Sequence, residues 1–170
     1  MSNKVVILSG ISGSGKSSYI RSISEKVWYP YFQSGDVGGA VVCSADHYFM
    51  SPWQGEYEFD FKKLSNAHGC CFRYFIESVQ YRSPLIIVDN TSTTVEEISP
   101  YVLGAQAYDY DVEVVTLVCP SAMGDDEYVR RCAERNSHGV PESGVRAQYE
   151  RLCNRQLPPW WKSKEVESKF

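Results

Sequence analysis

Residues 10–18 read GISGSGKSS, in which glycines, a lysine and serines follow the order Gly-x-x-x-x-Gly-Lys-Ser. Glycine lets a loop curl until several backbone N–H groups point at one anion, and a helix that follows adds positive potential. Lys16 would reach the β- and γ-phosphates of a nucleotide, and the Ser17 hydroxyl would ligate Mg²⁺. The spacing predicts a phosphate-binding loop whose contacts come from Gly10, Ser12, Gly13, Ser14, Gly15, Lys16, Ser17 and Ser18.

Two acidic residues follow apolar runs further along the chain, Asp46 in CSADHY and Asp89 in IIVDNT. An acid placed like Asp46 can take the proton from an attacking hydroxyl, although an aspartate can also serve only to cap a turn. Asp89 is placed to hold Mg²⁺ or its bound waters, as the acid of a Walker B strand does. Asn90 and Thr91 either orient a substrate or shape the turn, and the sequence favours neither.

The segment VRRCAERNSHGVP, residues 129–141, adds cations and a histidine. Arg131 and Arg135 are four residues apart, so they share one face of a helix. A planar guanidinium matches the oxygens of a phosphoryl group in transfer, and both arginines are therefore candidate catalytic residues on a lid. The alternative is a solvated helix face held by salt bridges. His138 is either part of the site or a structural residue.

Aromatic side chains gather in residues 48–59 and at Trp160 and Trp161. Beside a basic cleft such side chains can stack on bases, but they can equally cover the core. The sequence leaves both roles open.

The elements that must carry these residues alternate along the chain. Unbroken apolar runs predict strands over residues 5–10, 40–46, 84–91 and 111–120. Helices are expected from residue 16 to about 27, over 60–80, from the Thr94–Glu97 capping box, over 124–136 and over 141–153. This alternation predicts an α/β fold, the three-layer P-loop arrangement with a central parallel sheet.

Ligands of such sheets bind at the carboxyl ends of the strands, and Gly10, Asp46 and Asp89 all fall there. The three motifs are therefore expected to meet in one crevice. We assign residues 1–157 to one kinase domain and residues 158–170 to an irregular C-terminal tail.

Composition narrows the class of protein. The chain has 170 residues, 43% of them hydrophobic, and a net charge of −4 that argues mildly against a broad nucleic-acid-binding surface. The apolar runs are too short for a membrane span or a signal peptide. The six cysteines lack the spacing of a zinc site, and we expect them to be reduced thiols in a cytoplasmic protein.

The ordered set LSGISGSGKSS, CSADHYF, GEYEFD, IIVDNTS and RCAERNSHGVPESGVRAQYERL resembles the polynucleotide-kinase-like P-loop kinases over about residues 4–153. That family includes animal P-loop proteins and the kinase domain of phage polynucleotide 5′-kinase. The resemblance implies transfer of the γ-phosphate of ATP to a hydroxyl, typically the 5′-hydroxyl of a nucleic acid. Asp46 matches the general base of the family, Arg135 a lid arginine, and Asp89 the acid after the third strand.

One departure concerns the acceptor. The phage enzyme carries arginines just before and just after its catalytic acid, whereas Ala45 and Phe49 stand near those places here. Three alternatives to the polynucleotide acceptor therefore stay open: a hydroxymethylated base in DNA, a small-molecule hydroxyl, and a nucleotide-binding interaction module with weak kinase activity. The chain lacks the Asn-Lys-x-Asp motif of a guanine-specific switch.

Overall fold

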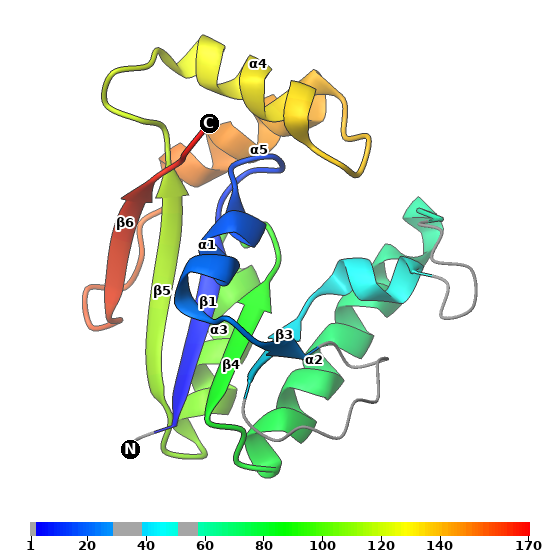
Figure 1. Ribbon diagram of the computed structural model, residues 1–170, viewed down its shortest axis with the longest axis vertical. Coiled ribbons are helices and arrows are strands. Elements are labelled where there is room, and N and C mark those ends of the chain that lie inside the picture. Colours follow the sequence, from blue (N-terminus) through cyan, green and yellow to red (C-terminus); the bar gives the residue numbers. More distant parts are fainter. Residues whose placement is uncertain (1–2, 29–38, 51–57) are drawn as a thin grey trace.

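Six parallel strands form the centre of the molecule. The structure, a computed structural model, describes residues 3–28, 39–50 and 58–170. Within them the strand order is β2-β3-β4-β1-β5-β6, and every neighbouring pair is parallel. The strands are β1 (Lys4–Ser9), β2 (Val27–Trp28), β3 (Ala40–Cys43), β4 (Leu85–Asp89), β5 (Asp111–Val118) and β6 (Ser163–Glu167) (Figure 1).

Helices cover both faces of this sheet. They are α1 (Lys16–Ile23), α2 (Leu64–Gln80), α3 (Val95–Gln106), α4 (Asp125–Arg135) and α5 (Glu142–Asn154), with short 3₁₀ helices η1 (Ala45–Phe49) and η2 (Phe61–Lys63). α2 and α3 lie on one face and α1 on the other (Figure 1). The predicted three-layer α/β fold is confirmed.

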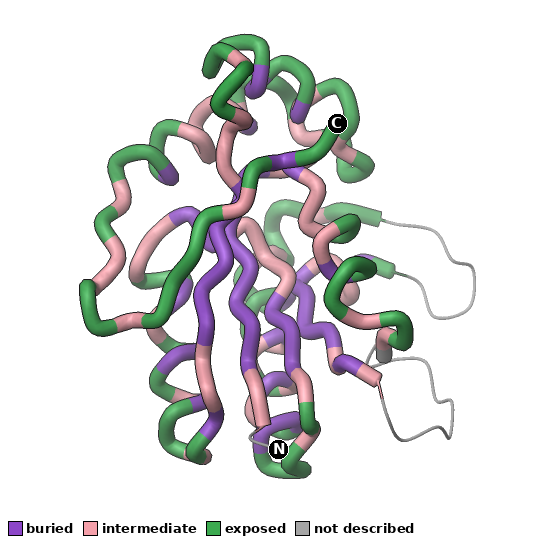
Figure 2. The backbone as a smooth tube through the Cα atoms, turned by 60° about the vertical axis from the view of Figure 1, so that its left-hand side comes forward, coloured by how far each residue is buried: buried purple, intermediate pink, exposed green. Residues whose placement is uncertain are grey.

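The central strands are buried on both faces, as their unbroken apolar runs predict. Alternate side chains of β1 point into two separate cores: Val5 and Ile7 pack with α2 and α3, and Val6 and Leu8 pack with Ile20 of α1. Figure 2 shows these strands as buried through most of their length. The sheet is therefore a rigid base for the loops at its carboxyl edge.

Helices α4 and α5 form a third core beyond the tips of the strands. Tyr128, Val129, Val145 and Leu152 pack there around Ile11 of the glycine loop. In Figure 1 the two helices lie above the arrowheads of β1 and β5. The arginine-rich segment, which we expected to form a lid, therefore packs directly on the glycine loop. We call α4 and α5 the lid helices.

Two predicted boundaries are wrong near the site. The helix that starts at Lys16 ends at Ile23, and Val27–Trp28 then forms β2. The second strand ends at Cys43 instead of Asp46, because the Ser44 hydroxyl accepts a hydrogen bond from the Asp46 N–H and starts η1. Asp46 therefore lies in a helical turn just beyond the strand.

The prediction of an irregular C-terminal tail is also wrong. Residues 163–167, SKEVE, form β6 beside β5 and complete the sheet. Four of the five residues are exposed, and Val166 packs against the core on the α1 face. A strand with one apolar side chain carries almost no period-2 signal, so the sequence gives little reason to expect it.

The predicted capping box is confirmed. α3 begins with the Thr94–Glu97 capping box and continues through Pro100. No helix in the described part of the chain is long and apolar enough to cross a bilayer. Trp53 and Tyr57 of the predicted aromatic loop lie outside the described residues.

Candidate active site

The glycine loop joins β1 to α1 and is shaped by close packing on the lid. Gly13 and Gly15 have φ angles of 82° and 96°, a region that side chains with a Cβ rarely adopt. A Cβ on Gly13 would lie 2.0 Å from the Cys132 carbonyl oxygen of α4. The loop also donates its Ser12 N–H to Gln148 Oε1 of α5, at 2.8 Å. Both lid helices therefore hold the tip of the loop.

Lys16 is half-buried at the first turn of α1. Its Nζ donates to the carbonyl oxygens of Gly10 and Ile11, at 3.0 and 3.1 Å. Burial lowers the pKa of this amino group, and the carboxylates of Asp89 and Asp46 offset part of that change. An anion at the loop would add to the effect of these two carboxylates.

The predicted loop residues divide into two groups. Those that line a cavity of about 240 Å³ at the carboxyl edge of the sheet are Ser12, Gly13, Gly15, Lys16, Ser17 and Ser18. Gly10 and Ser14 lie behind it: the Ser14 N–H donates to the Ile11 carbonyl, and its side chain is fully buried. These two positions shape the loop from within.

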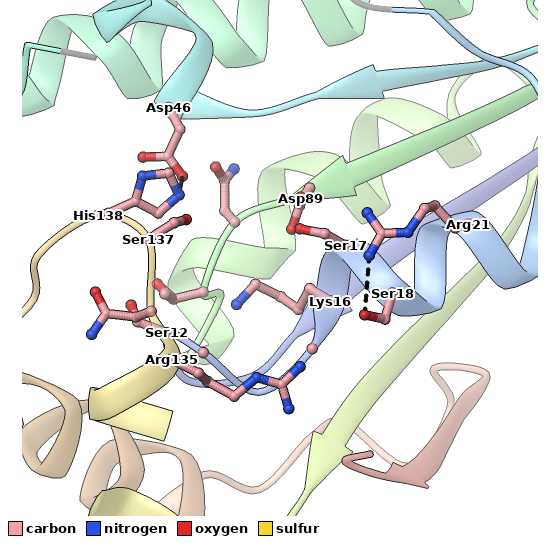
Figure 3. A pocket seen from close by; sticks show the side chains of 15 residues that line it. Ser12, Lys16, Ser17, Ser18, Arg21, Asp46, Asp89, Arg135, Ser137 and His138 are labelled. Atoms are coloured by element: carbon pink, nitrogen blue, oxygen red, sulfur yellow. Dashed lines mark hydrogen bonds and ion pairs between the residues drawn. The ribbon is translucent and has the colours of Figure 1, made fainter. Parts of the chain in front are cut away.

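Asp46 and Asp89 enter the same cavity, Asp46 from η1 just after β3 and Asp89 from the end of the neighbouring strand β4. Figure 3 shows both carboxylates and the Lys16 amino group directed into it. Burial raises the pKa of Asp89, whereas the charge of Lys16 counteracts that rise. The structure thus brings together one cation and two acids that are spread over the sequence, with Lys16 and Asp89 73 residues apart (89 − 16).

The loop after α4 meets Asp46 from the opposite side. His138 Nε2 lies 3.3 Å from Asp46 Oδ2. The loop keeps its shape through Asn136, whose Nδ2 donates to the Ala133 and Val140 carbonyls and whose Oδ1 accepts from the Val140 N–H. His138 and Ser137 consequently reach the cavity (Figure 3).

The two candidate arginines are placed differently. Arg135 lines the cavity, donates to the Lys169 carbonyl at 2.6 Å and lies 5.0 Å over the Phe170 ring. Arg131 is not among the lining residues; it pairs with Glu127 at 2.6 Å on the helix surface. Both arginines lie on α4 as predicted, but only Arg135 lines the cavity, whereas Arg131 pairs with Glu127 on the helix surface.

Arg21 is a cavity residue that the sequence reasoning missed. It lies on α1 one turn beyond Ser17 and donates to the Ser18 hydroxyl at 3.2 Å (Figure 3). The spacing of four residues from Ser17 is a signal that would have found it, since residues i and i+4 share a helix face. Arg21 is therefore a third cation at the cavity, beside Lys16 and Arg135.

Ser17 and Asp89 supply the oxygen atoms that suit Mg²⁺. No cluster of three or more His, Cys, Asp or Glu side chains with metal-binding geometry occurs within the described residues. Mg²⁺ is usually held by one or two protein oxygens together with substrate phosphates and waters, so this sparse set fits the ion. Such a site would be completed only by a bound nucleotide.

The aromatic residues play mixed parts. Phe49 is buried, and Tyr48 and Trp161 pack against the core beneath α2 and α3. Phe59 and Trp160 remain exposed, at 51% and 78%. Core packing therefore accounts for three of the five stacking candidates that the structure describes.

Known proteins provide comparisons for this geometry. A model of the AAA domain family matches residues 5–158. Human NEDD4-binding protein 2 is 31% identical over 141 residues, which cover 83% of this chain but only 7% of that protein. The chain thus spans a small part of the length of this relative.

Two solved structures share the fold. An unliganded sugar kinase from Janibacter sp. HTCC2649 has a TM-score of 0.60 and 18% identity, over 97% of this chain and 85% of its own. A chain of the Pnkp1/Rnl/Hen1 RNA repair complex has a TM-score of 0.60 and 20% identity, over 89% of this chain and 44% of its own. The chain therefore shares its α/β fold with both of these structures.

Proposed function

The chain belongs to the AAA domain family, and we propose that it is an ATP-dependent kinase whose acceptor is a hydroxyl of a nucleic acid, most simply a polynucleotide 5′-hydroxyl. One observation carries the proposal: Asp46 of η1 and Lys16 of α1 point into one cavity, with Arg135 at its rim. A GTPase or motor instead places a glutamine or glutamate to orient water. The matched motifs and the likeness to a chain of an RNA repair complex favour the nucleic-acid acceptor.

In this proposal the phosphates of ATP occupy the loop over residues 10–18. Lys16 and Arg135 balance the charge on the γ-phosphoryl group as it moves. The acceptor oxygen forms a bond to the γ-phosphorus, the bond from that phosphorus to the β–γ bridging oxygen breaks, and ADP leaves. Asp46 takes the proton from the acceptor hydroxyl.

Ser17 and Asp89 would hold Mg²⁺, which supplies further positive charge to the phosphates. His138, 3.3 Å from Asp46, would orient the carboxylate from the lid side. The exposed cation Arg21 would meet an anionic group of the acceptor or of the nucleotide.

A labelled-ATP assay tests the proposal. The protein is incubated with γ-labelled ATP and, separately, a 5′-hydroxyl oligonucleotide, a duplex with hydroxymethylated bases, and a panel of small hydroxyl compounds. We expect label on the oligonucleotide 5′ end. Transfer only to small molecules would show that the acceptor is a small-molecule hydroxyl and not a nucleic acid. ATP binding without any transfer would favour a nucleotide-binding interaction module.

The small-molecule alternative has its own support. The cavity holds only about 240 Å³ and the net charge is −4, both of which suit a compact acceptor. The fold is also shared by a sugar kinase. The same assay decides between the two acceptor classes.

A further inference from the structure

Asn90 follows Asp89 and lines the cavity, yet its amide is engaged with the protein on both sides. Its Oδ1 accepts from the Ala45 N–H at 3.0 Å. Its Nδ2 donates to Tyr101 Oη and Cys71 Sγ, at 3.4 and 3.5 Å. The polar atoms that could have oriented a substrate are therefore used to join four elements: the end of β4, η1, α2 and α3.

The bond to Ala45 lies at the start of the helix that carries Asp46. The first N–H groups of a helix have no partner within the helix. Here the Ser44 hydroxyl accepts from the Asp46 N–H at 3.2 Å, and Asn90 accepts from the Ala45 N–H. The β3–β4 ladder ends at the pair Cys43 and Val88. Asn90 thus continues the connection between these two strands where the sheet stops.

A buried pair fixes the other side of the amide. Tyr101 and Cys71 are 5% and 4% exposed, and Tyr101 Oη donates to Cys71 Sγ at 3.3 Å. Tyr101 also packs between Phe72 and Phe75, with ring centroids 5.4 and 5.1 Å away. An amide held at both ends against such packing has one orientation, so it can define the position of what it binds.

We propose that Asn90 is a positioning residue, which holds the start of η1 so that Asp46 faces the phosphoryl acceptor. The inference rests on the proposed function, in which Asp46 is the base. It decides between the two roles open for Asn90: the residue acts through Ala45 and Asp46 and does not bind the acceptor.

Transfer kinetics test the role. Asn90→Ala should lower kcat by about 10- to 100-fold, because small displacements of a reacting group cost factors of this size, while KM for ATP stays near the wild-type value. Asn66→Ala, a matched change at an exposed site on α2, should leave both constants unchanged. A rise in the acceptor KM with kcat intact would mean that Asn90 binds the acceptor, and would overturn the proposal.

Amide hydrogen exchange gives a reading that does not depend on activity. In Asn90→Ala, the peptide covering residues 44–49 should exchange several-fold faster, and peptides from β1 and β5 should not change. Unchanged exchange over 44–49 overturns the positioning role even where transfer falls. If the wild-type protein shows no transfer at all, the proposed function fails. Hydrogen exchange would still test whether the bond from Asn90 to Ala45 holds the start of η1.

A milder variant guards against misfolding. Tyr101→Phe removes only the hydroxyl behind the amide, so it should lower kcat by about threefold and raise exchange over 44–49 slightly.

Ser44→Ala removes the second hydrogen bond at the same helix start. The double variant Ser44→Ala/Asn90→Ala should lose less than the product of the two single losses, since both act on one element. Independent, fully multiplicative losses would contradict a shared role in holding η1.

Discussion

The two halves of the cavity are built in different ways. The phosphate-binding half takes its residues from a single stretch, residues 10–18, and the lid helices α4 and α5 pack on its tip. The half around Asp46 depends on residues far apart in the chain: Ala45 and Asn90 are 45 positions apart, and Asp46 and His138 are 92 apart (138 − 46). The residues of the loop can therefore be recognised from one stretch of sequence, whereas the residues of the Asp46 half come together only in the folded protein.

Loss of Lys16 should have the largest effect on the phosphate-binding half. Lys16→Ala removes the cation nearest the γ-phosphate and should lower the transfer rate by about 1,000-fold or more. ATP affinity should fall as well, because the bound phosphates lose the same charge. Rates of label transfer and calorimetric titration with ATP check both. Retention of transfer would show that the loop does not bind the transferred phosphate.

Asp46→Asn should separate the two halves. Removing the base should lower transfer by about 100- to 10,000-fold, while the dissociation constant for ATP stays within about twofold. The same two measurements apply. If ATP binding collapses together with transfer, Asp46 belongs to the phosphate-binding half as a metal ligand or structural residue, and the division between the halves is wrong.

The two arginines of α4 sharpen the comparison. Arg135→Gln should lower kcat by about 10- to 100-fold, because Arg135 lines the cavity. Arg131→Gln should change kcat by less than about twofold, since it removes an exposed pair with Glu127 and a contact with the Phe170 ring, neither of which lines the cavity. Equal losses in the two variants would mean that the lid turns on nucleotide binding and brings Arg131 to the phosphates.

The extent of sequence prediction follows the same division. The loop at Lys16, the capping box of α3 and the central strands could be predicted, because their signals lie within a few residues. β6 and the helical turn at Asp46 could not, because an exposed edge strand has little apolar pattern and a single Ser44 hydroxyl ends the strand β3. The bond from Asn90 to Ala45 has no local signal at all.

Two glycines test how the lid supports the phosphate-binding half. Gly13→Ala would place a Cβ 2.0 Å from the Cys132 carbonyl, so unfolding free energy should fall by about 3 kcal/mol. Gly139→Ala has a similar φ of 68° but open space around the new Cβ, so its loss should stay near 1 kcal/mol. Urea unfolding of both variants measures the difference. Similar losses of unfolding free energy in the two variants would show that the loop and α4 can move apart at little cost.

The smallest effect concerns acid stability near Asp46. Burial lowers the pKa of His47 to about 4, and the charge of Asp46 opposes this shift. The folded state therefore favours neutral His47, while an unfolded histidine binds its proton near pH 6.5. Its contribution to stability is complete above about pH 6.5 and is lost as the pH falls toward 4, where the unfolded state binds more protons.

Replacing this histidine should make the protein less sensitive to acid. Between pH 7 and pH 4.5 the free energy of unfolding of His47→Gln should fall by roughly 1–2 kcal/mol less than that of the wild type. His68→Gln, on the exposed surface of α2, is the matched control and should follow the wild-type curve. Urea titrations at several pH values measure these slopes. Parallel curves for His47→Gln and the wild type would show that η1 opens enough to solvate His47, and a helix that loose could not hold Asp46 as a base in a fixed position.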